Sequence, residues 1–111
     1  MTKAPSHPSL WDRMMSRGVE ERRRTALEKV DHILQEAKAE GFDVVLFGSL
    51  ARDDFMAHSD IDLLARGDVP PNRMAVLERI VSRHLKNTDL PYDLVFESAI
   101  GPENTRRLLN G

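Results

Sequence analysis

The chain has 111 residues, 16 Lys and Arg against 18 Asp and Glu, a net charge of −2 and no cysteine. This length fits one domain, and the absence of cysteine excludes disulfides, thiolate metal sites and thiol nucleophiles. The charge balance excludes a large basic surface, so a nucleic-acid partner is not expected. No apolar run is long enough to span a bilayer and no signal peptide is recognisable, so we expect a cytoplasmic protein without membrane contact.

The N-terminal residues predict a short lead and a first helix. Residues 1–8 contain two prolines and are expected to be a disordered lead to a single domain, residues 9–111. A helix is predicted to start at Ser9 and to end or bend at Gly18. Four apolar residues form a stripe on it: Leu10, Trp11, Met14 and Met15. We expect this stripe to pack on the core, with contact to a partner as the alternative.

A longer helix is predicted over residues 19–41, because its apolar residues recur at helical spacing and Gly41 is a typical helix stop. The charged run EERRR, residues 20–24, predicts a solvated helix face on which Glu20 pairs with Arg24.

The remainder alternates short apolar runs with helical patterns. Strands are expected at 43–47, 60–65 and 92–96, and further helices at 49–55, 71–87 and 102–110. The predicted order is α-β-α-β-α-β-α, a small mixed β-sheet flanked by helices in an α/β protein of the α+β type.

Two aspartates interrupt the second predicted strand. Because side chains alternate along a strand, Asp60 and Asp62 share one face, and Asp93 lies beside them if the second and third strands are neighbours. The intervening residues Ile61, Leu63 and Ala65 then point into the core. Two charges ~4 Å apart repel by about 4 kcal/mol at an effective dielectric constant of 20, so the cluster requires protons or a cation. Carboxylate oxygens suit Mg²⁺.

Each aspartate alone has a simpler interpretation, as a strand-end or exposed residue. D-x-D by itself is a weak signal.

A glycine and a serine follow the first strand directly. Gly48 permits a tight turn and a close ligand approach, and Ser49 at a helix start offers N–H groups and a hydroxyl to an anion. Arg52 is placed to reach a phosphate. The alternatives are an ordinary turn at Gly48, an N-cap at Ser49, and an ion pair of Arg52 with Asp53 or Asp54.

Taken together, "FGSLAR…SDIDLL" and the later "YDLVF" resemble the nucleotidyltransferase superfamily typified by DNA polymerase beta. In that superfamily a Gly-Ser pair precedes Asp-x-Asp by a spacer of about this length, and a third aspartate stands on a later strand. These motifs are most similar to those of the minimal nucleotidyltransferase (MNT) branch, whose members are often paired with a HEPN-type ribonuclease toxin. The resemblance covers about residues 26–110 and implies the nucleotidyltransferase fold.

The resemblance implies roles for the motif residues. Ser49 and the backbone after Gly48 would hold the terminal phosphates of a nucleoside triphosphate. Asp60 and Asp62 would bind two Mg²⁺ ions, and Asp93 would hold the catalytic ion and help deprotonate the attacking hydroxyl. The implied reaction moves AMP from ATP to a hydroxyl of a HEPN-type toxin, which makes the chain an antitoxin.

One residue departs from the family pattern. Relatives often have glycine after the Ala-Arg pair, where this chain has Asp53, whose charge is expected to weaken triphosphate binding or reshape the loop. The short chain also leaves the far side of the site open, so we expect the acceptor on another macromolecule or a cleft completed in a homo- or hetero-oligomer. Two alternatives stay open: a non-catalytic antitoxin that acts by binding, and a transferase acting on a small molecule or RNA end.

Overall fold

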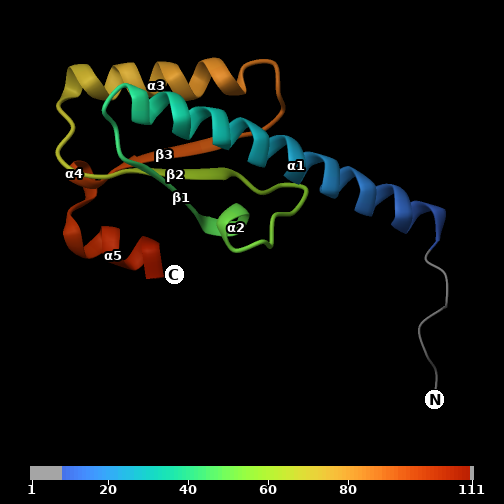
Figure 1. Cartoon of the computed structure of the whole chain (residues 1–111). Helices are drawn as coiled ribbons and strands as arrows, with labels where there is room; N and C mark the ends of the chain where they lie inside the picture. Colours follow the sequence, from blue (N-terminus) through green and yellow to red (C-terminus); the bar gives the residue numbers. More distant parts are fainter. Residues whose placement is uncertain (1–8, 111) are drawn as a thin grey trace.

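The computed structural model describes residues 9–110, which form five helices and three strands (Figure 1). They are α1 (Leu10–Ala39), β1 (Val44–Phe47), α2 (Gly48–Ala51), β2 (Ile61–Ala65), α3 (Pro71–Leu85), β3 (Tyr92–Phe96), α4 (Glu97–Ile100) and α5 (Pro102–Asn110). The predicted α+β class is confirmed. The lead expected at residues 1–8 lies outside the described residues.

The sheet is mixed, as predicted. Its strand order is β1-β2-β3, with β1 antiparallel and β3 parallel to β2. The parallel register places Ile61 opposite Tyr92 and Asp62 opposite Asp93, so β2 and β3 start side by side. The Ile61 N–H donates to the Pro91 carbonyl oxygen at 2.9 Å, which ties the two starts together.

One face of the sheet supplies the main core. Helices α1 and α3 lie next to each other over this face (Figure 1). Alternation along β2 sends its apolar side chains into it, and Ile61, Leu63 and Ala65 are at most 1% exposed. From α1, the predicted helical stripe contributes four fully or nearly fully buried residues: Ala26, Val30, Ile33 and Ala37. The periodicities of 2 and 3.6 residues therefore meet in one core.

The opposite face changes character along its length. Here Asp62 and Leu64 follow each other on β2, and Leu64 is fully buried whereas Asp62 is partly exposed. Helices α2 and α5 lie on this side of the sheet (Figure 1). The polar end of this face is thus the end at which β2 and β3 begin.

The first helix differs from its prediction. It runs without interruption from Leu10 through Gly18 to Ala39, so a helix end at Gly18 is wrong. Its first turns extend beyond the other elements (Figure 1), and Leu10 and Met15 are 66% and 47% exposed. Core packing is therefore wrong for these two residues of the stripe. The side chains of Trp11 and Met14 lie outside the described part of the structure.

Smaller differences concern helix boundaries. Helix α2 is one turn starting at Gly48 instead of a helix over 49–55, and α3 ends at Leu85 instead of residue 87. Helix α4 was not predicted, because its four residues carry no periodic signal. In residues 9–110, every helix is too short or too polar to cross a membrane.

Gly18 inside α1 and Gly41 just after its end provide a matched test of backbone conformation. A Cβ atom would meet no atom within 4 Å at Gly18 or at Gly41, but only Gly41 has a positive φ, +90°. We expect Gly18→Ala to raise the free energy of unfolding by up to about 1 kcal/mol, because glycine disfavours helix interiors. Gly41→Ala should lower it by about 1–2 kcal/mol. Urea unfolding measures both; equal effects would contradict the assignment of one uninterrupted helix ending before Gly41.

Candidate functional site

Three aspartates lie where β2 and β3 begin. Asp62 and Asp93 are register partners on parallel strands, so their side chains leave the same face as neighbours. Asp60 lies just before the first residue of β2. Asp62 is partly buried, while Asp60 and Asp93 are exposed. The predicted placement of Asp93 beside Asp62 is confirmed, whereas the chemical roles of the three residues stay predictions.

The electrostatics of the three carboxylates converge on Asp62. Burial raises the pKa of Asp62, and the negative charges of Asp60 and Asp93 raise it further, while Arg52 acts in the opposite direction. A raised carboxyl pKa means that the ionised form is disfavoured where it stands. The site thus favours a proton or a cation beside Asp62.

The glycine–serine corner lies directly against this carboxylate. Phe47, the last residue of β1, is the register partner of Asp62, so the chain turns at Gly48 immediately beside it. Gly48 has φ +78°, and a Cβ atom on it would lie 2.1 Å from Asp62 Oδ2 and 2.9 Å from Cγ. Glycine is therefore required at residue 48 by conformation and by space.

The neighbouring polar residues agree only partly with the prediction. Phe47 takes the N-cap place of α2, so Ser49 lies inside the single turn and its interpretation as an N-cap is wrong. Arg52 follows the helix and is exposed, and its Nε lies 3.5 Å from Asp54 Oδ2. The alternative pairing of Arg52 is thus present, although Arg52 is also close enough to lower the pKa of Asp62.

The carboxylates suit a hard divalent cation by chemistry but do not form a closed cage. All three donors are carboxylates, and charge repulsion at Asp62 favours a cation. Among the residues described, however, no three His, Asp or Glu side chains are gathered closely enough to hold a metal ion. The predicted site for two Mg²⁺ ions is therefore not preformed. The three carboxylates could hold a cation only together with further oxygen ligands.

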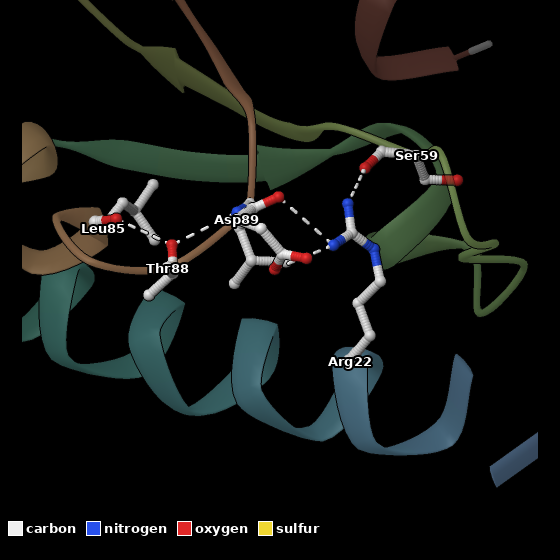
Figure 2. Close-up of polar contacts among 6 residues, drawn as sticks. Arg22, Ser59, Leu85, Thr88 and Asp89 are labelled. Carbon is white, nitrogen blue, oxygen red and sulfur yellow. Dashed lines mark hydrogen bonds and ion pairs between the residues drawn. The ribbon is translucent and has the colours of Figure 1, made fainter. Parts of the chain in front are cut away.

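Two arginines of α1 contact the loops around the site, so the predicted solvated face at residues 20–24 is wrong for them. Arg22 donates hydrogen bonds to the carbonyl oxygen of Ser59 and to Asp89 (Figure 2). Arg23 pairs with Asp53 at 2.7 Å and lies 3.9 Å from Glu20.

The sequence contained a signal for both arginines. Arg23 and Arg22 lie three and four residues before the buried Ala26, so they share the helix face of the apolar stripe of α1.

The conformation and contacts of Asp53 show how an aspartate fits where relatives often have glycine. Its φ is +66°, a conformation that glycine adopts freely and that aspartate tolerates better than most residues. Its carboxylate is engaged by Arg23 across the loop. This chain therefore adopts a positive φ here without glycine, and the Arg23 guanidinium partly offsets the charge of Asp53.

A hollow of about 550 Å³ lies between α1 and the loop before β3, and Gly18, Arg22, Asn87 and Asp89 help to line it. None of the three aspartates lines it. The carboxylates instead lie on an open face of the sheet.

Comparison with known families adds an independent result. Residues 27–111 match the model of a family described as nucleotidyltransferase domain. A search of curated proteins found no match to the sequence. The matched stretch contains Gly48, Ser49 and the three aspartates, whereas Arg22 and Arg23 precede it.

The contact between Gly48 and Asp62 predicts a coupled pair of substitutions. Gly48→Ala should lower the free energy of unfolding by roughly 2–5 kcal/mol, because it combines an unfavourable φ with a steric clash. In an Asp62→Ala background the clash with the carboxylate is removed, so the loss should shrink by roughly 1–3 kcal/mol. A double-mutant cycle by urea unfolding measures this coupling, and additive effects would contradict the close contact.

The raised pKa of Asp62 predicts a pH-dependent stability. The folded protein binds the Asp62 proton more tightly than the unfolded chain does. The contribution of this proton to the free energy of unfolding is therefore fully present below the unfolded pKa of about 3.9, and it is lost as pH rises through the folded pKa. Without divalent metal, Asp62→Asn should therefore raise Tm at pH 7 by a few degrees. The corresponding gain in the free energy of unfolding is less than about 1 kcal/mol, because solvent screens the charges. The gain should vanish below pH ~4. Asp68→Asn, at an exposed loop residue, is the control for thermal melts.

Proposed function

The chain belongs to the nucleotidyltransferase domain family, and on that premise we propose that it is a metal-dependent nucleotidyltransferase with a protein hydroxyl as acceptor. The observation that carries this proposal is the juxtaposition of Asp62 with Asp93 and Gly48, with the pKa of Asp62 raised by burial and like charges. An acidic group whose ionised form is disfavoured suits a cation bound together with phosphates.

The proposed reaction is a displacement at phosphorus. The acceptor hydroxyl oxygen forms a bond to the α-phosphorus of the nucleotide, the bond to the bridging oxygen breaks, and pyrophosphate leaves. Two Mg²⁺ ions, when bound, supply charge neutralisation for the attacking and leaving oxygens. Asp60, Asp62 and Asp93 would hold the ions, and Asp93 would also help to take up the proton of the hydroxyl.

The phosphates are proposed to lie at the glycine–serine corner. Gly48, with φ +78°, turns the chain beside Asp62, and the half-buried Ser49 that follows it can donate from its hydroxyl and N–H to an anion. Arg52 is exposed, and its ion pair within the described residues is with Asp54 at 3.5 Å, so it can turn to a phosphate.

The open face supports a macromolecular acceptor. Asp60 and Asp93 are exposed on the surface of the sheet, so a large partner can reach them without entering a cavity. The resemblance to minimal nucleotidyltransferases supports ATP as donor and a HEPN-type ribonuclease toxin as acceptor. In this proposal, transfer of AMP to the toxin silences it, and the chain acts as its antitoxin.

A binding antitoxin without catalysis is the second candidate. It is favoured by apolar side chains that stand out from the surface: Leu10 and Met15 of α1, and Met56 in the loop before β2, which is 62% exposed. Such residues suit contact with a partner. Both candidates predict a complex, but only the first predicts a covalent product.

Intact-mass spectrometry separates the two candidates. The chain is incubated with a HEPN-type ribonuclease, ATP and Mg²⁺, and the ribonuclease is weighed. We expect a mass increase of one or more AMP units, and at least about a 100-fold slower transfer with Asp62→Asn or Asp93→Asn. Asp68→Asn, beyond the other end of β2, should transfer at the normal rate.

Neutralisation of the ribonuclease without a mass change would support binding alone. Efficient transfer to a small molecule or an RNA end, without the ribonuclease, would contradict the protein acceptor.

A further inference from the structure

We propose that Arg22 is a positioning residue for the three aspartates, aided by Arg23. The two arginines bind the loop before β2 and the loop before β3, which lead into the candidate site. What the aspartates do once positioned rests on the proposed function; that Arg22 positions them does not. Neither arginine lies within the residues that match the family model, 27–111, so the family match assigns them no role.

Arg22 joins three parts of the chain. From α1, its Nη2 donates to the carbonyl oxygen of Ser59 at 3.3 Å (Figure 2). Its Nη1 donates to Asp89, to the main-chain oxygen at 3.3 Å and to Oδ1 at 3.2 Å. The Arg22 side chain is only 14% exposed, whereas that of Asp89 is 93% exposed. Two of these three bonds go to backbone carbonyls, so they hold the course of the chain itself.

The two loops end directly at the carboxylates. Ser59 immediately precedes Asp60, and Asp89 lies two residues before Pro91, whose carbonyl oxygen accepts the Ile61 N–H. The contacts of Arg22 and this bond therefore close a ring around the starts of β2 and β3. Any shift of this ring changes the distance between the aspartates of the two strands.

The surroundings of Arg22 favour arginine over lysine. A guanidinium has a planar fork that can serve two loops at once, whereas an ammonium is a point charge. The guanidinium also lies over the ring of the buried Phe55, 5.6 Å from its centre. On the other side, Thr88 donates to the Leu85 carbonyl and accepts from the Leu90 N–H, which holds the loop that presents Asp89 (Figure 2).

Arg23 fastens the third segment. Its Nη2 lies 2.7 Å from Asp53 Oδ1, in the turn that follows Gly48–Ala51. Consecutive arginines of one helical turn thus hold the segment after the glycine–serine corner, the residue before Asp60, and the loop before β3. Their Nε atoms are buried, and the structure records no hydrogen-bond partner for them within residues 9–110.

A purely structural role for Arg22 has a matched control. Arg83 also bridges two elements, from α3 to Glu36 of α1, at 2.5 Å and with a further bond at 3.3 Å. Within residues 9–110, the hydrogen bonds of the Arg83 side chain go to Glu36 of α1 and to no loop of the candidate site. Loss of either arginine is expected to lower Tm, but only loss of Arg22 is expected to loosen the starts of β2 and β3.

The test compares Arg22→Ala, Arg22→Lys and Arg83→Ala in the full chain. Hydrogen exchange followed by NMR reports the Ile61 amide, whose bond to Pro91 joins the two strands. We expect about tenfold faster exchange at Ile61 in Arg22→Ala relative to the Val81 amide of α3, an intermediate effect in Arg22→Lys, and no selective effect in Arg83→Ala. In the transfer assay, Arg22→Ala should lower kcat by roughly 10–100-fold and raise the Mg²⁺ concentration needed for half-maximal rate.

The outcomes separate the two hypotheses. If both Arg22 variants accelerate hydrogen exchange at the Ile61 and Val81 amides by the same factor, the positioning role is overturned, whatever the activity. Selective loosening in a protein whose wild type transfers no nucleotide would support positioning and contradict the proposed function. If Arg22→Ala does not fold, the Arg22→Lys variant decides, because it keeps the charge and removes the fork.

Discussion

The contact between Gly48 and the Asp62 carboxylate constrains the rest of this structure. A backbone corner with positive φ is placed so close to an acidic side chain that even one added carbon would lie 2.1 Å from its oxygen. The antiparallel pairing of Phe47 with Asp62 creates this approach, and the parallel pairing of Asp62 with Asp93 adds a second carboxylate to it. A three-stranded mixed sheet is thus sufficient to bring the glycine–serine corner together with Asp62 and Asp93.

The same arrangement of carboxylates lowers the stability of the fold, and helix α1 holds the loops around them in place. The ionised form of Asp62 is disfavoured by burial and by its acidic neighbours. The loops around it bury Phe55 and Leu90, and Arg22 and Arg23 hold these loops to α1 through hydrogen bonds and an ion pair. Helix α1 therefore has two functions along one stripe: apolar residues from Ala26 onward cover the sheet, and the arginines before them brace the site.

Most of the scaffold could be predicted because it depends on local periodicity. Alternation in β2 correctly predicted the burial of Ile61, Leu63 and Ala65, though not that of Leu64, and the pairing of β2 with β3 places Asp93 beside Asp62 as expected for neighbouring strands. The helix end at Gly18 was predicted wrongly, since a single glycine costs only about 1 kcal/mol and a long helix can bear that. The roles of Arg22 and Arg23 were missed because charge was taken as evidence of solvation, whereas long side chains can lie along a buried stripe and reach distant loops. The absence of a ready metal cage also could not be predicted, because it depends on side-chain placement within ångströms.

Titration of the Asp62 carboxyl by carbon-13 NMR, with and without Mg²⁺, tests the central claim most directly. The account predicts a pKa above the ordinary value in metal-free protein, because burial and the charges of Asp60 and Asp93 oppose ionisation. It predicts that Mg²⁺ together with a nucleoside triphosphate lowers this pKa, because a bound cation favours the carboxylate. An ordinary pKa for Asp62 that does not change on addition of Mg²⁺ and nucleotide would contradict the account.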